Sequence, residues 1–195
     1  ANLDTEEIKR FREVFSIEDL SDWYQKLLDE YHKWLSYSLK WKKERNESLQ
    51  NLEFPFPYRE GQRKMVGSVY HSISAGRQIF IQAPTGVGKT MSTIFPAVRA
   101  VGEGKGETIF YLTAKTITRT VAEEAFAVLQ EKGMKYKVVT ITAKDKLCFM
   151  EETKCNPAHC PYAKGHFDRV NDAVYELWTS SHVYDRQTIL GQAEK

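Results

Sequence analysis

The sequence predicts an α/β fold, in which helices alternate with the strands of a parallel sheet, behind a helical N-terminal extension. Three apolar runs rich in β-branched and aromatic residues occur at 78–82, 108–113 and 136–142, and amphipathic stretches separate them. A glycine-rich turn links the first run to the helical pattern that follows it. Upstream, apolar residues recur at the spacing of an α-helix from Ile17 to Leu39. These patterns predict βαβ units preceded by a long helix.

Composition restricts the class of protein. The 195 residues are 42% hydrophobic and 28% charged, values typical of an ordered globular chain with one or two domains. No apolar run approaches the ~20 residues needed to span a bilayer, and the N-terminal residues lack the features of a secretory signal. We therefore expect a cytoplasmic protein that does not engage a membrane. After residue 53 the chain carries 19 basic against 14 acidic residues, which permits an anionic partner.

The first 53 residues predict a helical extension. Residues 4–14 have the pattern of a short amphipathic helix, and Ser16 with Asp19 resembles a capping box that opens a longer one. The aromatic residues along the longer helix predict a face that packs in a core. Pro55 and Pro57 end this region, because proline disfavours helical backbone at the residue before it.

Four further helices are predicted after this proline-rich connector. Glycine often follows the last turn of a helix, because it adopts left-handed backbone without steric cost. Gly76 and Gly133 follow two of the helical patterns in this way. The predicted helices cover residues 59–75, 89–101, 117–131 and 163–178.

A phosphate-binding loop is the motif with the clearest chemistry. Residues Ala83–Thr90, with the sequence Ala-Pro-Thr-Gly-Val-Gly-Lys-Thr, follow a predicted strand and open a predicted helix. Glycines let backbone N–H groups approach phosphate oxygens, and the helix N-terminus adds the positive end of its dipole. Lys89 is expected to reach the β- and γ-phosphates of ATP, and Thr90 to hold Mg²⁺. Ala83 replaces the first glycine of the general pattern, a form typical of superfamily-2 helicases.

Hydrolysis of a nucleotide also needs an acidic residue on a neighbouring strand, which holds Mg²⁺ and positions water. Residues Asp29–His32 spell Asp-Glu-Tyr-His, the helicase form of this acidic box, but they precede the loop and lie within a helical pattern. We interpret them as a charged helix face. After residue 90 no apolar run ends in Asp-Glu. The sequence therefore predicts nucleotide binding without an acidic box of its own.

The three cysteines lie close together in a stretch with the composition of a loop, at Cys148, Cys155 and Cys160. An odd and clustered set indicates a metal site in a reducing compartment rather than a disulfide framework. Three thiolates need a fourth ligand to hold tetrahedral Zn²⁺ or a [4Fe–4S] cluster. His159 and His166 are the local candidates for a Cys₃His zinc site.

The phosphate loop and the three cysteines downstream of it together resemble the XPD/DinG family of iron–sulfur DNA helicases. Tyr58–Gln62 resembles the adenine-recognition element of that family, and Phe110–Thr116 resembles motif Ia. Thr142–Cys148 resembles the segment that leads to the first cluster cysteine. The resemblance covers about residues 54–195 and is closest to bacterial members.

The resemblance implies roles for individual residues. Lys89 and Thr90 are the implied catalytic residues. The implied nucleotide contacts come from Arg59, Gln62, Thr85, Gly86, Val87, Gly88, Lys89 and Thr90. It implies contacts to the backbone of single-stranded DNA from Thr113, Lys115 and Lys144. It also implies a [4Fe–4S] cluster whose ligands are a cysteine beyond Lys195 and the three cysteines Cys148, Cys155 and Cys160.

The implied organisation has three parts. The helical extension (1–53) precedes a partial RecA-like P-loop NTPase domain (54–147), and residues 148–195 begin an iron–sulfur insertion. The implied parent protein is an ATP-dependent DNA helicase that translocates 5′→3′ on single-stranded DNA and unwinds duplex, with this chain as an ATP-binding portion. Two alternatives remain open from the residues alone. One is a non-catalytic module that binds nucleotide or nucleic acid and carries a structural zinc site, and the other is a different P-loop ATPase or kinase.

Overall fold

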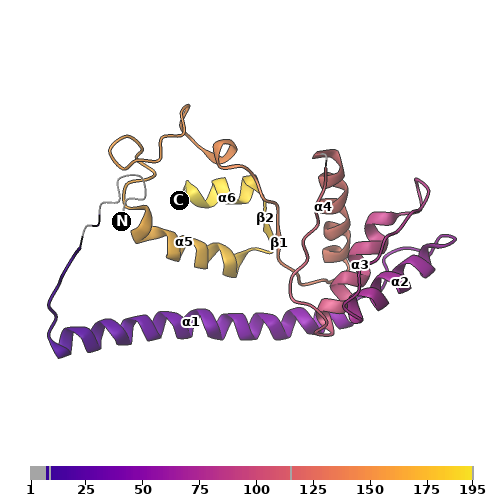
Figure 1. Ribbon diagram of the computed structural model, residues 1–195, viewed down its shortest axis with the longest axis horizontal. Coiled ribbons are helices and arrows are strands. Elements are labelled where there is room, and N and C mark those ends of the chain that lie inside the picture. Colours follow the sequence, from indigo (N-terminus) through magenta and orange to yellow (C-terminus); the bar gives the residue numbers. More distant parts are fainter. Residues whose placement is uncertain (1–7, 9, 115, 195) are drawn as a thin grey trace. The chain divides into compact units, whose positions relative to one another are not determined.

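The computed structural model describes residues 8, 10–114 and 116–194. The chain divides into two compact units, Ala1–Leu39 and Lys40–Lys195. Helix α1 (Ile17–Gln50) runs from the first unit into the second, and the other helices and strands belong to the second unit (Figure 1). Across the described ranges, no helix has both the length and the apolar character needed to cross a membrane.

Helix α1 begins at the predicted capping motif. The hydroxyl of Ser16 accepts a hydrogen bond from the backbone N–H of Asp19 at 3.0 Å and donates one to the Asp19 carboxylate at 2.6 Å. These contacts satisfy a backbone donor that the first helical turn leaves without an intrahelical partner. The predicted long helix is therefore confirmed, and it continues without a break for 34 residues.

Two expectations for the first unit are wrong. Residues 10–14 form no helix, and residues 4–7 and 9 of the predicted short helix lie outside the described residues. A short helix closes few hydrogen bonds for the cost of nucleating it, so it needs tertiary contacts to persist. Of the aromatic side chains of α1 that were expected in a core, Trp23, Tyr24 and Tyr31 are exposed, whereas Trp34 and Trp41 are half-buried. Within the described part of the first unit no second element covers the three exposed rings.

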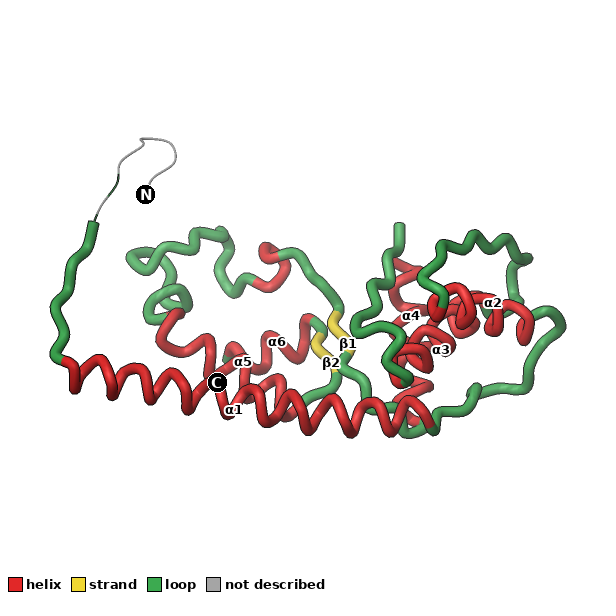
Figure 2. The backbone as a smooth tube through the Cα atoms, turned by 60° about the horizontal axis from the view of Figure 1, so that its bottom comes forward, coloured by secondary structure: helices red, strands yellow, loops and turns green. Residues whose placement is uncertain are grey.

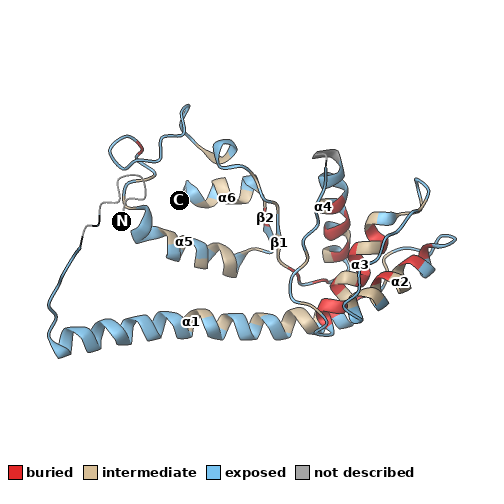
Figure 3. Cartoon of the chain, viewed as in Figure 1, coloured by how far each residue is buried: buried red, intermediate tan, exposed pale blue. Residues whose placement is uncertain are grey.

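The core of the second unit forms where α2 (Gln62–Ser74), α3 (Lys89–Gly102) and α4 (Thr116–Glu131) meet the end of α1. Helix α3 packs against α2 on one side and α4 on the other. Figure 3 shows the buried positions concentrated on these helices. Leu49, Val98 and Leu129 have no exposed surface and join α1, α3 and α4 into one apolar cluster. The predicted helices at 59–75, 89–101 and 117–131 are thus confirmed, with small changes at their ends.

The sheet is smaller than predicted. Strand β1 (Val138–Val139) pairs in parallel with β2 (Val183–Tyr184), with Val138 opposite Val183 and Val139 opposite Tyr184 (Figure 2). The strand expected at 136–142 is therefore confirmed in its central part. The pairing is parallel, but its partner is β2 and not one of the other two expected strands, so the expected sheet of consecutive βαβ units is not formed within the described ranges. β2 was not predicted, because two apolar residues are too short a run to signal a strand.

The strands expected at 78–82 and 108–113 are wrong for this structure. Both segments have the composition of a strand, but neither forms a hydrogen-bonded ladder within the described ranges. Most of their apolar side chains are exposed, with Phe80 and Leu112 at 95% and 89%, whereas Ile109 packs against the core. A strand is defined by pairing, so a β-rich run without an adjacent strand remains irregular.

The chain passes from β1 to β2 through the 3₁₀ helix η1 (Lys144–Leu147) and α5 (His166–Ser180), and α6 (Arg186–Ala193) follows β2. α5 confirms the helix predicted at 163–178, and α6 was not predicted. The Asp185 side chain caps α6 by accepting a hydrogen bond from the Thr188 backbone N–H at 2.8 Å. The Thr188 hydroxyl donates to the same carboxylate at 2.8 Å. The backbone and hydroxyl hydrogen bonds from Thr188 hold the pKa of the Asp185 carboxyl below its usual value.

The C-terminal ends of α1 and α3 cap one another. Neither the last turn of α1 nor the residues after it supply a basic side chain locally, and Arg99 of α3 takes that place. Its guanidinium donates to the carbonyls of Leu49 and Leu52, both at 3.4 Å, and to that of Gln50. In return, the Gln50 side-chain amide donates to the Gly102 carbonyl at 2.7 Å. Each helix thus satisfies carbonyl groups that the other leaves open.

This mutual cap requires glycine at position 102. A Cβ built at Gly102 lies 2.5 Å from the Leu49 Cβ and 3.2 Å from the Gln50 backbone nitrogen. We expect Gly102→Ala to lower the free energy of unfolding by about 1–3 kcal/mol, because overpacking forces the backbones apart. The matched control is Gly67→Ala within α2, where no atom lies within 4 Å of the added Cβ. That change is expected to stabilise the chain by about 0.5–1 kcal/mol. Urea unfolding of both variants measures the difference, and equal midpoints would contradict the close approach.

Candidate nucleotide-binding site

The loop Ala83–Thr90 has the backbone geometry that phosphate binding requires. Gly86 and Gly88 adopt left-handed backbone, with φ of 85° and 74°, and Gly88 is the N-cap of α3. These angles are strained for residues with a Cβ, which explains the two glycines. The loop therefore ends at the N-terminus of α3, where free backbone N–H groups and the helix dipole favour an anion.

Lys89 folds back onto this loop. Its Nζ donates hydrogen bonds to the carbonyls of Ala83 at 2.9 Å and Pro84 at 2.8 Å, and the side chain is exposed. The ammonium group thus lies against the main chain of the loop to which phosphate oxygens are expected to bind. Both acceptors are neutral carbonyls, so an anionic phosphate is the stronger partner for the lysine.

Gln62 and Arg59, both predicted as nucleotide contacts, lie against the phosphate loop. The Arg59 guanidinium donates to the Gly86 carbonyl, and the Arg59 backbone N–H donates to Gln62 Oε1 at 3.0 Å. Gln62 is 4% exposed, and a Cβ at Gly88 would lie 2.6 Å from its Nε2. The start of α2 and the loop are therefore fixed to one another through these two side chains.

Two hydroxyl side chains in the first turns of α3 donate hydrogen bonds to backbone carbonyls at the end of the loop. Ser92 is completely buried, and its hydroxyl donates to the Gly88 carbonyl at 2.9 Å. The Thr93 hydroxyl donates to the Lys89 carbonyl at 3.1 Å and the Thr90 carbonyl at 2.9 Å. Sequence reasoning did not identify Ser92 as part of the site. A polar residue on the buried face of an otherwise apolar helix is the signal that could have revealed it.

The other predicted nucleic-acid and nucleotide residues are dispersed. Thr85 is exposed at the tip of the phosphate loop, and Val87 and Thr90 are half-buried within it. Thr113 is exposed in the segment before α4, and Lys144 is exposed at the start of η1. Lys115 lies outside the described residues. The structure thus brings Arg59 and Gln62 to the loop without assigning Thr113 or Lys144 a partner there.

The three cysteines differ in their surroundings. Cys148 is half-buried, Cys155 is exposed and Cys160 is buried, and all three are free thiols. Within the described ranges, no group of three or more His, Cys, Asp or Glu side chains converges to hold a metal ion. The arrangement of these side chains therefore fits neither a [4Fe–4S] cluster nor a Cys₃His zinc site with His159 or His166.

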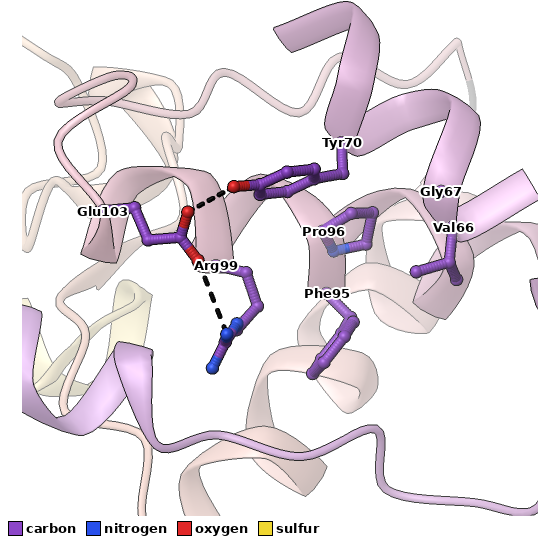
Figure 4. A pocket seen from close by; sticks show the side chains of 7 residues that line it. All are labelled: Val66, Gly67, Tyr70, Phe95, Pro96, Arg99 and Glu103. Carbon is purple, nitrogen blue, oxygen red and sulfur yellow. Dashed lines mark hydrogen bonds and ion pairs between the residues drawn. The ribbon is translucent and has the colours of Figure 1, made fainter. Parts of the chain in front are cut away.

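A separate cavity of about 380 Å³ lies between α2 and α3 (Figure 4). Tyr70 and Glu103 face one another across it, and the tyrosine hydroxyl donates to the carboxylate. This hydrogen bond raises the pKa of Tyr70. Arg99 lies beside them, with its Nη2 at 3.4 Å from Glu103 Oε1. The cavity lies along the C-terminal half of α3, at the opposite end of that helix from the phosphate loop.

Comparison with known proteins identifies the family. The sequence pattern of the DEAD/DEAH box helicases matches residues 59–174, which is more than half of the chain. The chain belongs to this family. The matched range includes the start of α2, the phosphate loop and the helix behind it, and so covers the site described above.

One relative extends the comparison. The chain is 28% identical over 123 residues to a protein of Methanocaldococcus jannaschii named as a probable ATP-dependent helicase. The match covers 61% of this chain and 18% of that protein, so the chain spans less than a fifth of its relative's length. No solved structure matches the chain.

Removal of the Lys89 ammonium tests the nucleotide site. We expect Lys89→Ala to weaken ATP binding by about 10-fold or more, because one charge-assisted contact to phosphate is worth about 1.5–3 kcal/mol. Lys105→Ala is the matched control, since Lys105 is exposed in the turn after α3. Titration with a fluorescent ATP analogue measures both affinities. Equal affinity of the Lys89 variant and the original chain would show that nucleotide binds elsewhere.

Proposed function

We propose that this chain is the ATP-binding part of an ATP-dependent DNA helicase that translocates on single-stranded DNA in the 5′→3′ direction. The observation that carries the proposal is the phosphate loop at the N-terminus of α3, fixed to Arg59 and Gln62 and located within the region that matches the helicase family. The relative from Methanocaldococcus jannaschii, by its name, supports ATP dependence. Polarity and the choice of DNA come from the resemblance to the XPD/DinG family.

Each residue at the loop has a role in this proposal. Lys89 leaves the carbonyls of Ala83 and Pro84 and binds the β- and γ-phosphates, and the Thr90 hydroxyl coordinates Mg²⁺. When bound, Mg²⁺ neutralises charge on the phosphates. Gln62 reads the adenine edge and Arg59 positions the loop through the Gly86 carbonyl. Because Gln62 also touches Gly88, adenine recognition and loop conformation are linked through one side chain.

DNA contacts are proposed for Thr113, Lys115 and Lys144. Lysine and threonine side chains bind backbone phosphates without reading the base sequence, which suits translocation along any strand. Thr113 and Lys144 are exposed and therefore accessible to a strand.

A labelled single-stranded DNA oligonucleotide tests this assignment. In fluorescence anisotropy titrations at several salt concentrations, Lys144→Ala is expected to weaken binding and to reduce the slope of log K against log salt by about 0.7, the value for one lost phosphate contact. Lys132→Ala, which removes an exposed lysine just beyond α4, is the control. An unchanged slope for the Lys144 variant removes that residue from the DNA contact, and tighter binding of RNA than of DNA overturns the DNA assignment.

The iron–sulfur cluster is a separate proposal that rests on the resemblance alone. Since the described thiols do not converge, no step of the mechanism is assigned to a cluster. Anaerobic reconstitution with iron and sulfide, followed by absorbance near 400 nm and elemental analysis, tests it directly. Brown protein that loses its colour in the Cys148→Ser variant supports cluster binding. Colourless protein with bound zinc supports the Cys₃His alternative.

A further inference from the structure

The cysteine-bearing region leaves and rejoins the fold at a single place. It departs after β1 at Thr140 and returns to β2 through His182, and the two strands are paired with one another. We refer to residues 140–182 as the excursion. Its base consists of few backbone contacts, including Val138 N–H to the His182 carbonyl at 2.8 Å and Thr140 N–H to the Tyr184 carbonyl at 2.9 Å. A parallel pair of two residues per strand is too short to be stable alone or to fix its own register.

Lys137, the residue before β1, binds the end of α5 and the strand β2, which form the returning part of this base. Its Nζ donates to the Ser181 carbonyl at 2.9 Å, to the Tyr184 hydroxyl at 2.8 Å and to the Trp178 carbonyl. An ammonium group has three N–H donors, so these acceptors match its full capacity. The single O–H of Tyr184 points to the same carbonyls, with that of Ser181 at 2.7 Å and that of Trp178 at 3.1 Å. One amine and one hydroxyl therefore share the same two carbonyls.

Those carbonyls are the C-terminal end of α5. Trp178 lies in the last turn of the helix, and Ser181 is its C-cap. The last turn of α5 contains no basic residue of its own. A positive charge at this end interacts favourably with the helix dipole and satisfies carbonyls that have no intrahelical donor. Lys137 thus caps a helix that begins 29 positions later in the sequence, at His166.

Aromatic rings surround the same amine. Lys137 Nζ lies 4.4 Å from the centroid of Trp41, 5.4 Å from that of Tyr184 and 6.0 Å from that of Trp178. Trp41 belongs to the part of α1 that lies in the second unit, and its ring also packs against His182, with centroids 4.8 Å apart. The cation–π contact therefore ties the base of the excursion to the part of α1 that lies in the second unit.

We propose that Lys137 is a positioning residue that fixes the register of β1 against β2, and so determines how the cysteine-bearing excursion is attached to the helicase core. A slip of one residue between the strands would move Tyr184 away from the amine, whereas the observed register brings the carbonyls of α5 and the tyrosine to the same amine. This inference does not depend on what the cysteines bind, nor on the nucleotide site.

The role of Lys137 is specificity of conformation rather than overall stability. Burial lowers the pKa of the Lys137 ammonium to about 8, so at pH 7 the amine still carries its proton. The same desolvation is a cost that offsets the gain from its contacts. Without the amine, the Tyr184 hydroxyl still reaches the Trp178 and Ser181 carbonyls, so the loss is limited to contacts at this one place. The effect of such a change is therefore expected at the base of the excursion.

Amide hydrogen exchange of the whole chain at pH 7 tests the proposal. In the original sequence, the amides of Val138 and Thr140 are expected to exchange at least about 100-fold more slowly than open backbone, although two paired residues alone protect little. Exchange of these amides at the rate of open backbone overturns the proposal without any variant.

Three variants then distinguish a role in positioning the two strands from a role in the stability of the whole chain. Lys137→Met is expected to speed exchange of Val138, Thr140 and the end of α5 by about 10-fold or more, while amides of α3 and α4 remain unchanged. Lys137→Arg keeps a charged donor and is expected to restore much of the protection. Lys135→Met is the matched control, because Lys135 pairs with Glu44 at 3.0 Å outside the cap. Equal protection in the Lys137→Met chain and the original chain, or equal loss in the Lys135 variant, overturns the proposal.

Discussion

The second unit depends on the close approach of two helix ends, those of α1 and α3. With only hydrogen at the Cα of Gly102, the backbone of α1 comes near enough for Leu49 to enter the core and for Gln50 to reach the Gly102 carbonyl. Arg99 then closes the end of α1 from the other side. Because these contacts fix α3 at its C-terminus, the N-terminus of the same helix is held in position to present the phosphate loop. The site is thus supported by an interaction at the far end of the helix that bears it.

The same physical device appears twice in this chain. Neither α1 nor α5 has a basic residue in its last turn, and each receives a cation from a distant part of the sequence, Arg99 for α1 and Lys137 for α5. A local basic residue would stabilise one helix alone. A distant one also joins two elements. This explains why the ends of these helices coincide with the places where segments far apart in the sequence are connected.

The parts of the molecule that the sequence could predict are those governed by local rules. The capping motif at Ser16 and the helix that follows the phosphate loop each depend on a few adjacent residues, and both are confirmed. The left-handed backbone of Gly86 and Gly88 is likewise a local property of the loop. The strands could not be predicted in the same way. The runs at 78–82 and 108–113 have strand composition, yet pairing depends on which other segment lies alongside, and β2 pairs despite being only two residues long.

The candidate site shows the same division. The positions of Lys89 and the two glycines follow from the motif, whereas the burial of Ser92 and the contact of Arg59 with the Gly86 carbonyl depend on tertiary packing. Cysteine spacing predicted a shared metal site, but proximity in sequence does not bring Cys148, Cys155 and Cys160 together in the described structure. Ligand geometry is a property of the folded loop, which spacing alone does not define.

The two unpaired apolar segments have a practical consequence for the isolated chain. Phe80 and Leu112 are almost fully exposed on backbone that has strand composition and that forms no ladder within the described ranges. Such segments act as templates on which another extended chain can be added, with main-chain hydrogen bonds and apolar side chains both contributing. Purified alone and concentrated, the chain is therefore prone to self-association at these edges, and its solubility depends on what covers them.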